Sequence, residues 1–208
     1  MAKCMMILGL LVATLMVPTA LGSDPDLTTD FNVTNPTVAD FTFTGFRNPQ
    51  PLGPGNAAPT PAAIPGLSGL GLTAVLFEFG ATSQIDPHTH PRATELFYVT
   101  LGPLDVGFVD TANELFETTV QTGDIFVFPK GTLHWQRNNG AGTASGFSVL
   151  SSENPGTLLI AKALFTAGGK GLPDIVLSTA FNVGANNKEI DEIKEKVAQR
   201  NNVTLTLY

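Results

Sequence analysis

The chain has 208 residues, with 11 Lys or Arg against 18 Asp or Glu, which gives a formal net charge of −7. This length fits one domain with a substantial core. The acidic balance argues against a nucleic-acid partner, because no basic surface is available for phosphates. A hydrophobic content of 43 % excludes general disorder, and the 21 Gly, 15 Pro and 14 Phe indicate β-structure joined by tight turns.

Residues 1–22 have the pattern of a secretory signal peptide. Lys3 precedes an apolar run over residues 4–17, and small residues then lead to a cleavage site before Ser23. The run is shorter than the roughly 20 residues that a membrane-spanning helix needs, so a cleaved signal is favoured over a membrane anchor. Cleavage would remove Cys4, the only cysteine, so the mature chain would have no disulfide and no membrane attachment.

Two Asn-x-Thr tripeptides, which begin at Asn32 and Asn202, are candidate N-glycosylation sites in an exported chain. Such tripeptides are common by chance, and they gain meaning here only because a signal peptide precedes them. An exported chain without disulfides depends for its stability on its core, on a bound metal or on self-assembly.

The next segment, residues 23–71, is predicted to form an N-terminal arm and loop. Its second half, from residue 48, is rich in Pro, Gly and Ala and has no sustained periodicity. Residues 72–165 differ, because short runs of β-branched and aromatic residues alternate with turn residues. The predicted strands are 72–79, 94–100, 105–109, 116–120, 124–128, 133–136, 146–150 and 158–161. Turn signals at roughly 8–12-residue intervals predict an all-β sandwich or barrel.

The last segment, residues 166–208, is predicted to be helical. Apolar residues at helical spacing between residues 186 and 200 predict an amphipathic helix. Pro173 is suited to open a shorter helix that ends at Phe181.

The three histidines of the chain, together with one glutamate, form a candidate metal site. His88 and His90 are two residues apart, so in a strand they share a face and can reach one ion. Glu95 and His134 lie on runs that a closed sheet would bring alongside. A single histidine is more often a hydrogen-bonded core residue, but all three in this arrangement favour a site for Mn, Fe, Zn or Cu. The alternative for Glu95 is a partner of the ligands instead of a ligand.

These residues resemble the two motifs of the cupin superfamily. The first motif is matched by His88, His90, Glu95 and Gly102, and the second by Gly123, Pro129, Gly131, His134 and Asn138. Within the cupins, the chain is similar to the germin-like proteins and spherulins. This closer similarity rests on the hexapeptide from His90, the tripeptide from Asp24 and the pentapeptide from Ser152.

The resemblance implies a jelly-roll β-barrel that holds one manganese ion, or another divalent transition metal, through His88, His90, Glu95 and His134. It also implies secretion to an extracellular matrix or cell wall. The expected assembly is a homo-oligomer, either a dimer or a trimer of dimers, with the C-terminal helices packed against neighbouring subunits. Some members of the family oxidise oxalate and others dismutate superoxide.

Two departures from the family pattern bear on function and stability. Germins usually carry two joined cysteines near the mature N-terminus, and this chain has none there. Oxalate-oxidising members place a substrate-binding Asn where Ile85 stands. Because Ile85 cannot donate a hydrogen bond to a buried carboxylate, oxalate oxidation is disfavoured.

Three further residues near the motifs have open or structural assignments. Asn138 either donates a hydrogen bond near the metal or is a turn residue beside Asn139 and Gly140. Trp135 and Phe128 are expected to fill the barrel.

Two functions of different classes fit the sequence. The first is a redox enzyme that acts on superoxide or on another small anion or oxygen species. The second is a non-catalytic extracellular matrix or encystment protein whose metal is structural, because a fold does not by itself imply an activity. The first is preferred, and other cupin chemistries, such as a dioxygenase or decarboxylase, rank third.

Overall fold

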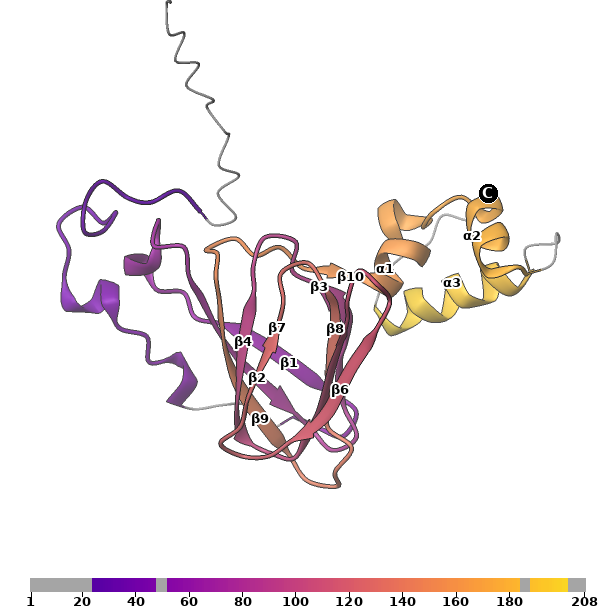
Figure 1. Cartoon of the computed structure of the whole chain (residues 1–208), viewed down its shortest axis with the longest axis horizontal. Helices are drawn as coiled ribbons and strands as arrows, with labels where there is room; N and C mark the ends of the chain where they lie inside the picture. Colours follow the sequence, from indigo (N-terminus) through magenta and orange to yellow (C-terminus); the bar gives the residue numbers. More distant parts are fainter. Residues whose placement is uncertain (1–23, 48–51, 184–187, 202–208) are drawn as a thin grey trace, which may run out of the picture.

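The structure, a computed structural model, describes residues 24–47, 52–183 and 188–201. Two five-stranded antiparallel sheets face each other and form a barrel, with an N-terminal arm on one side and a group of helices on the other (Figure 1). This is the all-β jelly-roll barrel that the sequence predicts. Within the described ranges, the helices are all too short or too polar to cross a lipid bilayer.

The two sheets have the strand orders β1-β2-β9-β4-β7 and β10-β3-β8-β5-β6. The strands of the first sheet are β1 Ala57–Pro61, β2 Thr73–Phe79, β9 Ala144–Leu150, β4 Glu95–Leu101 and β7 Ile125–Phe128. Those of the second are β10 Leu158–Leu159, β3 Gln84–Thr89, β8 Leu133–Arg137, β5 Leu104–Val109 and β6 Leu115–Val120. Strands far apart in the sequence therefore lie side by side, which is how a site built from several strands can form.

Alternation of side chains along each strand places the core between the sheets. In β4, Phe97 and Val99 are fully buried, whereas Leu96 and Tyr98 face outward and are exposed. Phe128 is also buried and fills the barrel as predicted. Rings from both sheets meet in this core, where Phe108 of β5 and Phe126 of β7 lie 6.1 Å apart between centroids.

Two local expectations need correction. The predicted loop over residues 48–71 contains β1, which pairs with β2 from Ala57 opposite Phe79. Pro residues mask this strand in the sequence, but β1 is at the edge of its sheet, where missing N–H donors are tolerated. The predicted strand over 158–161 is only half strand, because β10 ends at Leu159 and helix α1, Ile160–Phe165, follows directly.

The C-terminal helices form a small cluster beside the barrel. Helices α2, Asp174–Phe181, and α3, Lys188–Arg200, confirm the two predicted helices, and Pro173 is the N-cap of α2. Phe165, Leu177 and Ile190 are buried together where α1, α2 and α3 meet. The buried Lys194 pairs with Asp174, and Arg200 reaches across to Asp86 of β3 at 2.8 Å.

The N-terminal arm contains short 3₁₀ turns at Val38–Phe41, Gly45–Arg47 and Pro65–Leu67. Its first described residue, Asp24, accepts hydrogen bonds from the Ser152 hydroxyl at 2.9 Å and from the Glu153 backbone N–H at 2.6 Å. These two bonds attach the arm to the barrel where no disulfide is available. The predicted signal peptide and Asn202 lie outside the described residues, whereas Asn32 is exposed on the arm.

Candidate metal centre

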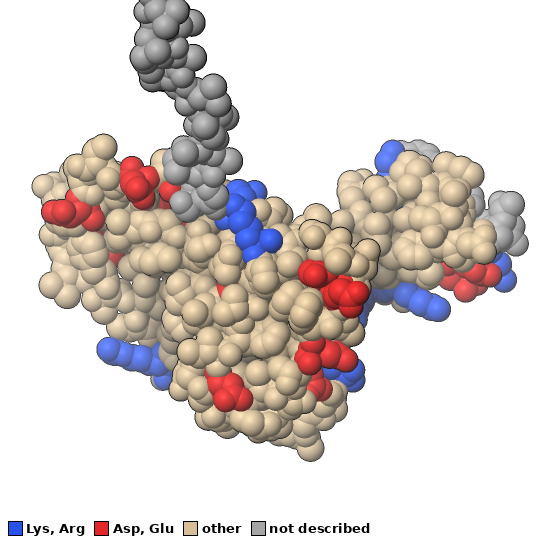
Figure 2. Space-filling view, viewed as in Figure 1, with Lys and Arg blue, Asp and Glu red and all other residues tan. Residues whose placement is uncertain are grey.

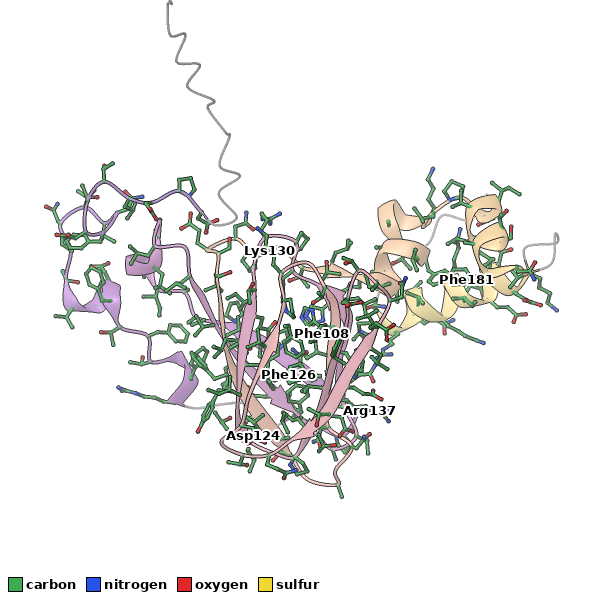
Figure 3. The ribbon with its side chains drawn as sticks, in the orientation of Figure 1. Phe108, Asp124, Phe126, Lys130, Arg137 and Phe181 are labelled. Atoms are coloured by element: carbon green, nitrogen blue, oxygen red, sulfur yellow. The ribbon has the colours of Figure 1, made fainter. Side chains whose placement is uncertain are left out.

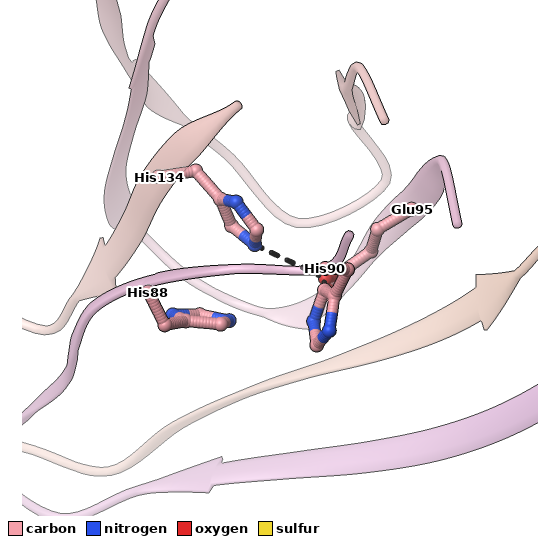
Figure 4. Close-up of side chains that lie close together, drawn as sticks. All are labelled: His88, His90, Glu95 and His134. Atoms are coloured by element: carbon pink, nitrogen blue, oxygen red, sulfur yellow. Dashed lines mark ion pairs between the residues drawn. The ribbon is translucent and has the colours of Figure 1, made fainter. Parts of the chain in front are cut away.

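The four residues singled out by the sequence come together on the inner face of the barrel. His88 lies on β3, His90 directly after it, Glu95 at the start of β4 and His134 on β8. All four are buried, and one ligand atom from each lies within 4.8 Å of the others (Figure 4). The antiparallel register of β3 and β8 places His88 directly opposite His134. Residues from three strands thus converge at one point.

Backbone carbonyls fix the orientation of all three imidazole rings. The Nδ1 contacts run from His88 to the carbonyl of Asp86 at 2.8 Å, from His90 to that of Gly156 at 2.6 Å, and from His134 to that of Thr132 at 2.9 Å. Because a carbonyl oxygen only accepts hydrogen bonds, each Nδ1 carries the proton. Each Nε2 of a neutral ring therefore presents a lone pair, as a metal-binding histidine requires.

The carboxylate of Glu95 is oriented by two buried side chains. Its Oε1 accepts hydrogen bonds from the Ser148 hydroxyl at 2.6 Å and from the Gln136 amide at 3.3 Å. Its Oε2 points the other way and lies 3.2 Å from Nε2 of His90 and 3.4 Å from Nε2 of His134. One oxygen is thus held by the protein, and the other faces the histidines.

The pKa values of three of the four groups are shifted by burial and by the other members of the cluster. Burial alone would raise the pKa of Glu95, but the adjacent rings of His134 and His90 and the hydrogen bond from Ser148 outweigh it and lower the pKa to about 2. Burial likewise opposes protonation of His90, but the nearby carboxylate of Glu95 outweighs it and raises the His90 pKa. Burial and then repulsion from His134 lower the pKa of His88 to about 4, so that ring stays neutral.

These four groups fit a divalent transition-metal ion. Among the buried polar atoms without a hydrogen-bond partner are Nε2 of His90, Nε2 of His134 and Oε2 of Glu95. Buried acceptors that face one another are costly unless a cation joins them. Three nitrogen donors and one oxygen donor suit Mn, Fe, Zn or Cu. The fit rests on the unpaired atoms and on the fixed tautomers together.

A cavity of about 450 Å³ adjoins two of the four residues, His88 and His90. Its apolar wall consists of Pro59, Pro61, Val75, Phe77, Ile85, Leu150, Pro155 and Leu159. Among the described residues that line it, Glu153 is the one ionisable side chain besides the two histidines. The site is therefore reached through a largely apolar space, and Ile85 lies in its wall.

The structure resolves the open assignment of Asn138 and corrects that of Trp135. Asn138 is buried, and its amide donates to the carbonyls of Gly80 and Gly142 while its Oδ1 accepts from Gly140 N–H. It is therefore the turn residue, not a group near the metal. Trp135 does not fill the barrel, because the alternation of β8 turns it to the outer face, between the inward His134 and Gln136.

Sequence reasoning missed two residues that support the site, Gln136 and Ser148. Gln136 is two residues after His134 on the same strand, so the alternation used for the histidines would have identified it. Ser148 is an ordinary serine within a strand, and only the neighbouring positions of β9 and β4 bring it to Glu95.

Comparisons with known proteins agree with this description. Residues 57–189 match the family model described as Cupin. The chain is 38 % identical to "Germin-like protein 5-1" of Oryza sativa subsp. japonica, over 95 % of this chain and 96 % of that protein. It is 43 % identical to "Germin-like protein subfamily 2 member 4" of Arabidopsis thaliana, over 80 % and 76 %. A solved structure of an oxalate oxidase superimposes with a TM-score of 0.75 at 28 % identity and covers 85 % of this chain and 99 % of that one.

Proposed function

The chain is a germin-like protein of the cupin family, and on that premise we propose that it is a secreted manganese enzyme that dismutates superoxide. The residues that would hold the ion are His88, His90, Glu95 and His134. Bound manganese supplies one-electron exchange between its divalent and trivalent states. The protein's own part is to hold these four ligand atoms in place and to admit a small substrate beside them.

The observation that carries the proposal is the convergence of unpaired Nε2 and Oε2 atoms next to a cavity. Catalytic metal sites keep a position open for substrate, whereas structural sites are closed by protein ligands. The cavity reaches His88 and His90, so a bound ion would be accessible from that side. This supports the enzyme over the competing function, a non-catalytic matrix protein with a structural metal.

The shape and charge of the cavity favour a small monoanion over oxalate. A dicarboxylate needs hydrogen-bond donors or cations when it leaves water. Here the wall is mostly apolar, Ile85 offers no donor, and the carboxylate of Glu153 would repel an anionic organic substrate. A divalent ion with one carboxylate ligand keeps a net positive charge, which attracts superoxide to the centre of the site.

The proposal extends to export and assembly. The signal-peptide pattern of residues 1–22 and the exposed Asn32 support an exported glycoprotein of the extracellular matrix or cell wall. A homo-oligomer, a dimer or a trimer of dimers, is supported by exposed apolar side chains on the outer face of the first sheet. They are Leu96, Tyr98, Ile125 and Val127.

The test starts from protein secreted by a eukaryotic host and purified without chelators or added metal. Elemental mass spectrometry is expected to find about one manganese per chain, as one cluster of four ligands requires. Superoxide dismutation is then compared among wild type, Glu95→Gln and Glu78→Gln. Both variants remove one carboxylate charge, but Glu78 faces outward on β2.

We expect Glu95→Gln to lose both manganese and activity, and Glu78→Gln to keep both. Zinc in place of manganese, or manganese without turnover, would support the structural-metal function instead. A folded protein without any metal would refute the site itself.

A further inference from the structure

Strand β8 presents different chemistry on its two faces. His134 and Gln136 point into the barrel, while Trp135 and Arg137 point out. The register of the second sheet continues these outward positions across β5 and β6. Two cross-strand rows result, each running from β8 over β5 to β6. The first consists of Arg137, Asp105 and Thr119, and the second of Trp135, Gly107 and Glu117.

The indole ring of Trp135 lies across the sheet over Gly107. A Cβ at Gly107 would be 2.5 Å from Cη2 and 2.6 Å from Cζ2 of Trp135, so the six-membered ring occupies the space of the missing side chain. The same position is 3.0 Å from Cβ of Glu117. Glycine at this position therefore leaves room for the ring over β5, and Trp135 also lines the hollow beside it.

A hollow of about 420 Å³ opens over this ring. Its polar lining consists of Asp105, Glu117, Thr118, Thr119, Arg137 and Asn139. Arg137 projects from the outside of the barrel near β6 (Figure 3), where acidic and basic side chains lie close together on the surface (Figure 2). The volume falls within the roughly 300–1,000 Å³ of small-ligand sites.

Some polar side chains of the hollow are held by hydrogen bonds, and others make none within the described residues. Asp105 accepts a hydrogen bond from Thr119 at 2.7 Å and another from the Asn139 amide, so its position is set. Within the described part of the chain, the side chains of Arg137 and Glu117 make no hydrogen bond or ion pair. The hollow thus combines an aromatic ring with a planar donor group and an acceptor that have no side-chain partner among the described residues.

From this arrangement we propose that the outer face of β5, β6 and β8 is a carbohydrate-binding site for neutral pyranose units of a glycan. The apolar C–H face of a sugar ring stacks on the indole of Trp135, as aromatic rings stack on other flat apolar groups. Arg137 donates to ring hydroxyls, and Glu117 accepts from them. Two carboxylates against one guanidinium disfavour acidic sugars and phosphates, so the ligand is neutral.

The site can be tested directly, because Trp135 is the only tryptophan of the chain. Intrinsic fluorescence excited in the tryptophan band therefore reports on the Trp135 ring alone. The wild-type protein is titrated with cellohexaose, xylohexaose and mannohexaose, and with oligogalacturonate as the charged comparison. We expect at least one neutral hexasaccharide to shift or quench the emission with saturation, and oligogalacturonate to have no effect.

Affinity electrophoresis in gels that contain the matching neutral polysaccharide measures variants without relying on fluorescence. Trp135→Ala is expected to lose about tenfold or more in affinity, as removal of a central aromatic contact does. Gly107→Ala keeps the ring but displaces it, and it is expected to weaken binding to a similar extent. Phe41→Ala removes an exposed aromatic ring from the N-terminal arm and is expected to bind as wild type does.

Metal content serves as the measure of folding for all three variants, because the ligands lie on the inner face. A variant that keeps its metal and loses the glycan supports the proposal. The proposal is overturned if none of the neutral hexasaccharides gives a saturable response. It is also overturned if the gel retards Trp135→Ala and wild type equally. Binding of oligogalacturonate alone would also overturn it, because the ligand would then be acidic.

Discussion

Replacement of Ser148 by Ala isolates the contribution of one hydrogen bond to the candidate metal centre. The Ser148 hydroxyl is fully buried and donates to Oε1 of Glu95 at 2.6 Å. A hydrogen bond to a charged group contributes about 1.5–3 kcal/mol, which corresponds to about a 10- to 150-fold change in an equilibrium constant. Loss of a residue that orients a metal ligand typically costs about 10- to 100-fold in affinity. The second donor, Gln136, is at 3.3 Å and can compensate only in part.

We therefore expect Ser148→Ala to bind its ion about 10- to 100-fold more weakly than wild type. Competition against a chromophoric chelator at fixed pH measures the affinity. Ser145→Ala is the matched control, because Ser145 lies on the same strand but on the outer face, where its hydroxyl pairs with that of Thr100 at 2.7 Å. The control is expected to bind as wild type does.

Equal affinity of Ser148→Ala and Ser145→Ala would refute the reasoning. In that case the orientation of Glu95 would not depend on Ser148, or Glu95 would not be a ligand. Thermal melts of both metal-free variants separate a specific loss of binding from a general loss of stability.

Three further predictions concern the ion and its cavity. Metal content after dialysis should decline as the pH falls from about 8 to about 4. Burial opposes protonation of His90, but its contact with Glu95 raises its pKa, so protons compete with the ion for this ring. A metal content that stays constant over this pH range would contradict the competition. Ile85→Asn places an amide in the cavity wall, and calorimetry should detect oxalate binding by the variant but not by wild type. Equal binding by the two proteins would show that Ile85 is not the residue that excludes oxalate. Chelation should lower the melting temperature, since an ion at about 1,000 times its Kd contributes about 4 kcal/mol, and unchanged melting would contradict a bound ion.

The convergence of the four candidate ligands could be predicted because its signal is local and periodic. His88 and His90 are separated by the repeat of a strand, and His134 and Glu95 belong to runs that a closed barrel must bring together. Strand β1 could not be predicted in this way. An edge strand needs hydrogen bonds on one side only, so its sequence tolerates Pro59 and Pro61, which elsewhere indicate a loop.

The prediction that Trp135 fills the barrel was wrong because it followed the general preference of aromatic rings for the core and not the alternation of side chains along β8. Aromatic rings favour the core, and this preference placed Trp135 inside the barrel. Strand alternation, which identifies His134 as inward, requires its neighbour to face outward. A large aromatic ring on an outer face then needs its own explanation, and Gly107 beneath it gives one.

A single loop, residues 151–157, links the N-terminal arm to the metal centre. Glu153 donates its backbone N–H to Asp24 of the arm, and Gly156 presents the carbonyl that orients His90. Between them, Arg92 holds both the backbone carbonyl and the side chain of Asn154. The same loop supplies part of the cavity wall. These contacts attach the arm to the barrel without a covalent link. They also make the orientation of one ligand depend on residues more than 60 positions away in the sequence.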